Sequence, residues 1–476
     1  MRKMRLFTGI ALLSIVLAGC KEPSLNAPPP PPSATAYGPM NDAMTSGGIE
    51  IELATNAQDA WWHDFASEKL NTLINTAFTH SPTIEAAQAR MHAAEAEVLA
   101  VRGETALPQS TLQAGSKQEK NDLHVMGMPA TIPNPDAFTL TNLAVHVEYN
   151  FDWNHAGRYK RAIAAENLAE QREELKAARI ALAENIVAAV FELVSAEEMR
   201  SAYGAEQSNL EQQIQILRRQ IQAGAMPEEK MEGLKRSLDN TRDAMETARL
   251  SAEQARRRIA VLAGSEPGSD LAIPSRISDF APVSRIAVVV PSSLVRNRPE
   301  IRAAEIRMKS ASANAGLAAA NLYPTFTLKG DLSTERRTIA DLAKGFNLWS
   351  IGGSMSEPIL NRKALRAQKA EAIEQYNAAL ADYRERTLEG LLETSLAIAE
   401  LKSAEKHKEI AEDFYQSQRK SEAVTERRFQ AGSLSELAAI VARGDVLRAD
   451  RNQTEMRVRQ MQAVANLMAA TACSIQ

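Results

Sequence analysis

Two very long stretches without proline constrain the fold of this chain most strongly. Residues 159–222 and 363–430 are rich in Ala, Glu, Arg, Leu and Gln, and each contains a single glycine. These residue types favour helix, and at about 1.5 Å per residue each stretch would form a rod roughly 95 to 100 Å long. A helix of this length cannot be buried within one globular core, so we predict rods that pack side by side as coiled coils.

Shorter helical segments flank each rod and offer it packing partners of similar length. Residues 82–102 and 228–262 flank the first rod, and residues 299–321 and 434–470 flank the second. Each rod can therefore pack against helices that belong to its own half of the chain.

The two halves of the chain resemble each other. Residues 81–87 read SPTIEAA and residues 298–304 read RPEIRAA, at an offset of 217. The end of the first rod, RQIQAG at residues 219–224, matches RRFQAG at residues 427–432. The chain is therefore expected to contain two structural repeats, each with a helix, a strand hairpin, a very long helix, a turn and a helix.

Alternating apolar and polar residues predict the two hairpins, at about residues 107–153 and 322–360. From residue 143 to residue 152 the odd positions are apolar and the even positions are mostly polar. Runs of about ten such residues suit tilted transmembrane strands, with apolar side chains toward lipid and polar ones toward a lumen. The strand near residues 110–116 has the weakest pattern. The predicted lumen residues are His146, Glu148, Asn150, Asp152, Thr325, Thr327, Lys329, Ser350 and Ser354.

The N-terminus carries an export signal. Three basic residues within the first five positions precede an apolar run at residues 10–17, and residues 17–20 read LAGC. This pattern is typical of a signal peptide at residues 1–19 and resembles the bacterial lipobox, in which Cys20 receives diacylglycerol and an N-acyl chain. The alternative is an ordinary signal peptide followed by a chance cysteine. The Pro-rich segment after Cys20 predicts an extended tether over residues 20–57.

Composition and motifs exclude several classes of function. Loss of the signal peptide would change the formal charge from -4 to -7, and no basic patch with interleaved aromatics suggests nucleic-acid binding. The seven histidines lack metal-ligand spacing, and the chain has no zinc-protease, nucleophile-elbow or phosphate-loop motif. We therefore predict a protein that is not an enzyme and needs no cofactor beyond the lipid on Cys20.

Four strands per chain cannot close a membrane barrel, because single-chain barrels begin at eight strands and open edges leave backbone groups unsatisfied in lipid. The chain is therefore expected to oligomerise. Closure alone would allow a dimer, a trimer or a tetramer.

The arrangement of motifs resembles the TolC-like outer-membrane efflux proteins, and in detail their NodT-type lipoprotein branch. The resemblance covers about residues 58–471. The matching residues are Trp61-Trp62, Phe65, Leu70, Pro82, Pro299, Phe151-Asp152-Trp153, Gly157-Arg158, residues 428–432 (RFQAG), Ser435 and Leu437.

This resemblance implies a mainly helical protein with membrane strands, in which a homotrimer forms a twelve-strand β-barrel on an α-helical periplasmic tunnel. It places the first repeat at residues 58–265, a linker at 266–298, the second repeat at 299–471 and a tail at 472–476. It also implies an outer-membrane exit duct for small molecules. The partners would be outer-membrane lipid, a periplasmic adaptor and an inner-membrane pump of the RND type or another type. The open alternatives are a duct for type I protein secretion, a periplasmic adaptor lipoprotein and a cell-envelope enzyme.

The same resemblance assigns roles to the two turns between long helices. It implies an adaptor-docking tip made of Arg219, Gly224, Arg428, Gly432, Ser433, Leu434 and Ser435. Related proteins often carry acidic residues six and nine positions after the tip glycine, whereas this chain has Ala438 and Val441 there. The aperture would then use the nearby Glu228, Glu229 and Glu436, or would be hydrophobic and close by dewetting.

Overall fold

The computed structural model describes residues 25, 45–46, 49–54, 60–120, 129, 131, 133, 136–289, 291–338 and 340–472. The predicted signal peptide, Cys20 and most of the predicted tether lie outside these residues. The chain divides into two compact units, which we call the strand unit and the helical unit. The strand unit comprises Met1–Pro28, His92–Glu170 and Glu305–Asp382, and the helical unit comprises Pro29–Met91, Gln171–Ala304 and Tyr383–Gln476.

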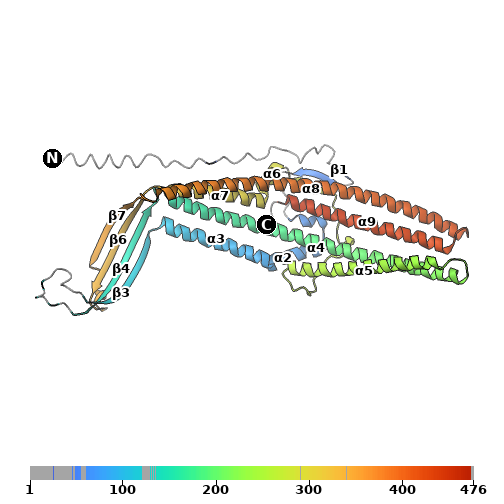
Figure 1. Cartoon of the computed structure of the whole chain (residues 1–476), viewed down its shortest axis with the longest axis horizontal. Helices are drawn as coiled ribbons and strands as arrows, with labels where there is room; N and C mark the ends of the chain where they lie inside the picture. The colour runs from blue at the N-terminus through green and yellow to red at the C-terminus, as the bar shows by residue number, and fades with distance from the viewer. Residues whose placement is uncertain are drawn as a thin grey trace. The chain divides into compact units, whose positions relative to one another are not determined.

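The strand unit contains a four-stranded antiparallel sheet and the helical segments that lead to it (Figure 1). Its strands are β3 (Gln109–Glu119), β4 (Phe138–Phe151), β6 (Thr325–Arg336) and β7 (Leu348–Ser356), in the order β3-β4-β6-β7. Both predicted hairpins are present, and the weakly patterned strand near residues 110–116 is β3. The two hairpins are joined by pairing of β4 with β6, so one sheet combines strands from both repeats.

The two faces of this sheet differ in chemistry because side chains alternate along each strand. On one face Val145 lies opposite Leu332, which lies opposite Trp349. Apolar side chains on this face are exposed, with Trp349 at 77% and Ile351 at 70% exposure. A contiguous exposed apolar surface of this kind indicates contact with lipid or with another chain.

Four helices enter or leave the sheet, namely α3 (Pro82–Ala106), α4 (Ala156–Gln222), α7 (Pro299–Ala320) and α8 (Arg362–Gln430). Trp153 anchors the start of α4, because its indole N–H donates to the carbonyl oxygen of Pro324 at 2.8 Å. Near that point α7 and α4 approach closely: a Cβ on Gly316 would lie 2.3 Å from the Tyr159 ring. Glycine is therefore required for this contact.

An isolated residue of the N-terminal segment also belongs to the strand unit. Leu25 packs against Met308 of α7 and against Tyr376 and Leu380 of α8. These three partners are 3 to 5% exposed, so they form a small apolar cluster of their own.

Long helical hairpins dominate the helical unit. Helix α4 turns back into α5 (Glu229–Leu262), and α8 turns back into α9 (Glu436–Thr471) (Figure 1). The observed rods span residues 156–222 and 362–430, within three residues of the predicted bounds. No helix in the described part of the chain is both long and apolar enough to cross a bilayer.

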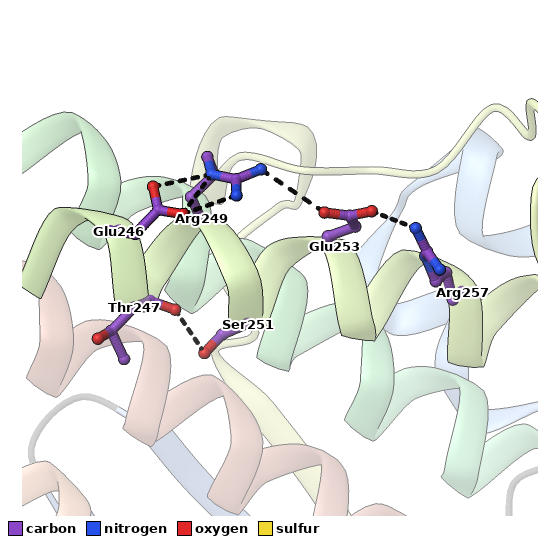
Figure 2. A network of polar contacts seen from close by, with 6 residues as sticks. All are labelled: Glu246, Thr247, Arg249, Ser251, Glu253 and Arg257. Atoms are coloured by element: carbon purple, nitrogen blue, oxygen red, sulfur yellow. Dashed lines mark hydrogen bonds and ion pairs between the residues drawn. The ribbon is translucent and has the colours of Figure 1, made fainter.

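The amphipathic pattern of α5 shows why these hairpins pair. Ala248, Ala252 and Ile259 on one side of the helix are buried. The other side carries a row of ion pairs that runs from Glu246 through Arg249 and Glu253 to Arg257 (Figure 2). Because these side chains are exposed, the ion pairs contribute little to stability, and apolar packing holds the hairpin together.

A second, three-stranded sheet lies in the helical unit and corrects the predicted extent of the tether. Strand β2 (Ile49–Ala54) pairs with β1 (Thr45–Ser46) on one side and in parallel with β5 (Arg285–Val289) on the other. The predicted tether at residues 20–57 therefore includes two strands, β1 and β2. The reason lies in the sequence Ile-Glu-Ile-Glu-Leu, which alternates correctly for a strand with one buried face.

The core of the helical unit is an aromatic cluster. The Phe65 ring lies 5.2 Å from that of Phe191, and Phe191 lies 5.2 Å from Phe280. Trp61 and Trp62 are each 2% exposed. Full burial of side chains this large contributes about 1.5 to 3 kcal/mol each, which makes the cluster a main source of stability. The remaining short elements are η1 (Trp61–Phe65), α2 (Glu68–His80), η2 (Ile277–Asp279), α6 (Pro291–Asn297) and η3 (Ala340–Lys344).

Candidate functional site

A row of paired polar side chains crosses the second face of the four-stranded sheet. The register places His146 opposite Asp331, and Asp331 opposite Ser350. The Nδ1 of His146 lies 2.5 Å from Oδ1 of Asp331, and the Ser350 hydroxyl donates to Oδ2 of the same carboxylate at 2.8 Å. One carboxylate therefore links three neighbouring strands.

Two further pairs continue this row along β4 and β6. Lys329 Nζ lies 3.3 Å from Oε2 of Glu148, and the Thr327 hydroxyl donates to Oδ1 of Asn150 at 2.6 Å. The charges of Lys329 and Glu148 thus compensate one another between β4 of the first repeat and β6 of the second repeat. Asp331, which is not among the nine predicted lumen residues, bonds to His146 and Ser350 on the two neighbouring strands.

Eight of the nine predicted lumen residues share this face by strand alternation. They are His146, Glu148, Asn150, Thr325, Thr327, Lys329, Ser350 and Ser354. The described part of the chain contains no group of His, Cys, Asp and Glu side chains suited to hold a metal ion. All eight of these side chains are polar or charged, so they form a polar wall.

Asp152 is the exception, because it lies just past the strand and its side chain serves a helix. Strand β4 ends at Phe151. The Asp152 carboxylate instead accepts hydrogen bonds from the backbone N–H groups of Gly157 at 2.6 Å and Arg158 at 2.7 Å. Arg161 lies 3.3 Å from the same carboxylate. Asp152 therefore caps the start of α4, where free N–H groups favour a negative side chain.

The two turns between long helices have the same backbone structure. Gly224 and Gly432 both have φ of 71°, in the left-handed region that glycine adopts without strain. The N–H of Ala225 donates to the Gln220 carbonyl, and that of Ser433 donates to the Arg428 carbonyl. Both turns are thus glycine-terminated helix ends with matching hydrogen bonds.

Side chains of the second turn are largely used to hold its shape. The Ser433 hydroxyl donates to the Arg428 carbonyl at 2.9 Å, and the Ser435 hydroxyl accepts from the N–H of Ala438 at 3.3 Å. Leu434 is half-buried between them, whereas Arg428 is exposed. The exposed residues of the predicted tip are therefore two arginines, two glycines and two serines whose hydroxyls bond to the backbone.

The predicted aperture residues lie near these turns. Glu436 begins α9, and its carboxylate lies 3.4 Å from Nη2 of Arg219 on α4. Glu228 and Glu229 are exposed at the start of α5. Val441 on α9 is 41% exposed. Glu436, a predicted aperture residue, thus pairs with Arg219, a predicted docking residue, and this ion pair connects the two helical hairpins.

A polar seam between α4 and α9 was not predicted from the sequence. The Asn209 side chain donates to the Ile440 carbonyl at 3.1 Å and accepts from Gln213 at 2.7 Å. Gly444 faces this cluster, since a Cβ there would lie 2.6 Å from Oδ1 of Asn209. The spacing of Asn209 and Gln213 could have predicted this contact, because residues four apart lie on the same face of a helix.

Glu184, whose carboxyl has a raised pKa, lines a cavity of about 410 Å³ in the helical unit. Loss of water around Glu184 raises the pKa of its carboxyl, Arg298 opposes this increase, and the carboxylates of Glu393 and Glu300 add to it. Arg298 also pairs with Glu300 at 3.1 Å and with Glu393. The cavity therefore holds more negative than positive groups.

Comparison with known proteins supports a single family. The sequence pattern of the family described as outer membrane efflux protein matches residues 73–265 and 290–472. Among curated relatives, the pyoverdine export outer membrane protein OpmQ of Pseudomonas aeruginosa is 22% identical over 91% of this chain and 92% of its own length. The toluene efflux pump outer membrane protein TtgC of Pseudomonas putida is 23% identical over 97% and 94%. Nodulation protein T of Rhizobium leguminosarum bv. viciae is 26% identical over 75% and 70%.

Solved structures show the same fold. The outer-membrane channel OprN superposes with a TM-score of 0.81 at 21% identity, over 95% of this chain and 99% of that chain. The CmeC outer membrane channel of Campylobacter jejuni superposes with a TM-score of 0.82 at 18% identity, over 96% and 95%.

Proposed function

Since this chain belongs to the outer membrane efflux protein family, we propose that three copies of it assemble into the exit duct of a tripartite pump that exports small molecules. The chain is an outer-membrane efflux protein. The proposal adds the trimer, its twelve-strand barrel, the adaptor and inner-membrane pump as partners, and a passive mechanism without catalysis.

The single observation that carries the proposal is the two-faced sheet. Its apolar face is exposed, and its polar face carries groups that already compensate one another. In the described part of the chain, β3 and β7 each pair on one side only. Unpaired strand edges cost several kcal/mol per backbone group in lipid, so neighbouring copies would supply the missing partners. Four strands from each of three copies would give twelve.

Planar-bilayer conductance of the purified protein, with chemical cross-linking to count subunits, tests the duct. We expect stable conductance and a cross-linked trimer. A monomer without conductance would contradict the proposal.

A matched pair of substitutions tests which face meets lipid. Ile351→Lys places a charge on the apolar face of β7, where it would cost about 2 to 4 kcal/mol at the midplane of the bilayer. Ser350→Lys places the same charge on the polar face of the same strand, where we expect assembly to persist. Trimer yield in outer-membrane fractions distinguishes the two, and equal losses would count against the assigned faces.

The exposed turns at Gly224 and Gly432 are the proposed docking surface for the adaptor. Gly432→Val should abolish export. The added side chain meets no atom within 4 Å, and the strain of a valine at positive φ is confined to the turn, so we expect trimers and conductance to remain. Gly345→Val provides the control, since Gly345 also has positive φ and open space around it. Loss of the trimer in Gly432→Val alone would give the turn a purely structural role.

Lipidation at Cys20 forms a separate part of the proposal. The contact of Leu25 with α7 and α8 supports it, because Leu25, five positions after Cys20, lies against the strand unit. Cys20→Ser should abolish incorporation of labelled palmitate and weaken anchoring, while trimers and export largely persist. Equal palmitate incorporation in the variant would exclude Cys20 as the acceptor.

A further inference from the structure

Two short segments flank each hairpin of the strand unit. A residue pair that ends in proline precedes the first strand: Leu107-Pro108 before β3 and Tyr323-Pro324 before β6. An apolar segment follows the second strand and leads into a long helix: Trp153 after β4, and Ile359 with Leu360 after β7. Each repeat therefore has a segment of both kinds.

Inside the chain, the end of the first hairpin packs against the start of the second. The Trp153 indole N–H donates to the carbonyl oxygen of Pro324 at 2.8 Å. The centre of its ring lies 6.1 Å from that of Tyr323 and 5.4 Å from that of Phe326. This contact lies beside the paired strands β4 and β6, so it joins the two repeats where strand gives way to helix.

The two remaining flanking segments are exposed. Ile359 is 77% exposed, Leu360 is 98% exposed and Leu107 is 61% exposed. They lie beside β7 and β3, which form opposite edges of the four-stranded sheet (Figure 1). Three strand spacings, about 14 Å, separate these edges, so the two segments cannot meet within one sheet.

We propose that Ile359 and Leu360 of one copy pack against Leu107-Pro108 of a neighbouring copy. The contact that joins the repeats inside the chain is thus repeated between chains. This inference rests on the proposed trimer and specifies how its copies meet. It covers the exposed apolar segments at both edges of every sheet, and a closed ring of copies leaves none of them open.

The repeat also specifies the register between copies. Each hairpin begins with a pair of opposite residues, Gln109 with Glu148 and Thr325 with Ser356, so the offsets between repeats are 216 and 208. On the inner strands Val147 lies opposite Gly330. The same offsets place Met355 of one copy opposite Ala114 of the next. Both positions belong to the apolar face, as the alternation of side chains requires.

Paired cysteines test this register in full-length protein from outer-membrane fractions, in a Cys473→Ser background. Ala114→Cys with Met355→Cys should give disulfide-linked trimers on mild oxidation, because opposite Cβ atoms lie about 4.5 to 5.5 Å apart. Ser116→Cys with Met355→Cys is the matched control. It moves one cysteine by two positions on the same face, to a diagonal distance of about 7 to 8 Å, and should cross-link at least tenfold less.

A charge exchange tests the contact of the flanking segments. Leu360→Lys and Leu107→Glu should each lower the yield of trimer at least about tenfold, because a charge replaces a leucine buried between copies. The two together should restore most of the yield, whereas Leu360→Lys with Leu107→Lys should not. Circular dichroism verifies that the helices form in every variant.

Equal cross-linking of the two cysteine pairs, or no recovery in the charge exchange, would overturn the proposed contact. If the wild-type protein were still a conducting trimer, the proposed duct would stand without it. A wild-type protein that forms no trimer would overturn both.

Discussion

Arg451 of α9 pairs with Glu206 of α4 across 245 residues of sequence, with the Arg451 Nε 2.7 Å from the Glu206 Oε1. The side chains are 24% and 9% exposed. The Arg451 guanidinium also lies 4.9 Å from the centre of the Tyr203 ring. This pair connects the hairpin of the first repeat to that of the second, and it is shielded from water far better than the ion pairs along α5.

Removal of Arg451 should therefore destabilise the helical unit. Arg451→Leu leaves the Glu206 carboxylate buried without its partner, at a cost of about 3 kcal/mol. Arg448→Leu, one turn earlier, removes an exposed pair with Asp445 and should cost less than about 1 kcal/mol. Thermal unfolding followed by circular dichroism compares the two. Similar midpoints for both variants would show that the buried pair contributes nothing beyond an exposed one.

Gly444 should tolerate no side chain, for a steric reason. In Gly444→Ala the new Cβ lies 2.6 Å from Oδ1 of Asn209 and 3.2 Å from Nε2 of Gln213, so the polar seam must shift. We expect a loss of about 1 to 2 kcal/mol. Gly204→Ala on α4 meets nothing within 4 Å and should stabilise by about 0.5 to 1 kcal/mol, because alanine favours helix. Opposite shifts of the unfolding midpoint are the expected outcome, and shifts of one sign would contradict it.

Glu184 should make stability depend on pH. Because the pKa of its carboxyl is raised above the usual 4.5, the folded protein holds this proton more tightly than the unfolded chain does. Stability should therefore fall as pH rises above 4.5 toward the raised pKa. Glu184→Gln should flatten this part of the profile, whereas Glu400→Gln, which lines the same cavity, should preserve it. Unfolding midpoints between pH 4.5 and 7 provide the test, and a profile unchanged by Glu184→Gln would refute the assignment.

The Asp152 cap should be needed to begin α4 correctly. Asp152→Ala removes the acceptor of two backbone N–H groups and should cost about 1 to 2 kcal/mol. Asp270→Ala, at an exposed aspartate after α5, should change stability by less than about 0.5 kcal/mol. Hydrogen exchange at residues 156–160 should accelerate only in Asp152→Ala. Unchanged exchange there would mean that the cap is dispensable.

Local chemistry explains why the helices and hairpins could be predicted. Pro82 and Pro299 begin helices, and Gly224 and Gly432 end them, because each residue type favours the backbone conformation required at that point. The strict alternation of apolar and polar residues along β4 and β6 predicted which side chains share a face. These signals depend on neighbouring residues only, so one sequence is enough to show them.

Contacts between distant segments could not be predicted in this way. Nothing local to Glu206 indicates that its partner is Arg451, since two helices in different repeats must first pack together. The capping role of Asp152 was not predicted, because a carboxylate one residue past the strand suits both a polar face and a helix cap. Strand β2 was missed because its six residues follow a Pro-rich segment that obscured the alternation.

The contact made by Leu25 also acts as a ruler for the lipid anchor. From Met308 the helix α7 continues for twelve residues to Ala320, a rise of about 18 Å, before the first strand of the second hairpin. The five residues from Leu25 back to Cys20 span at most about 18 Å when fully extended. Acyl chains proposed on Cys20 would therefore be attached within about 18 Å of Leu25, whatever the length of the Pro-rich segment that follows it.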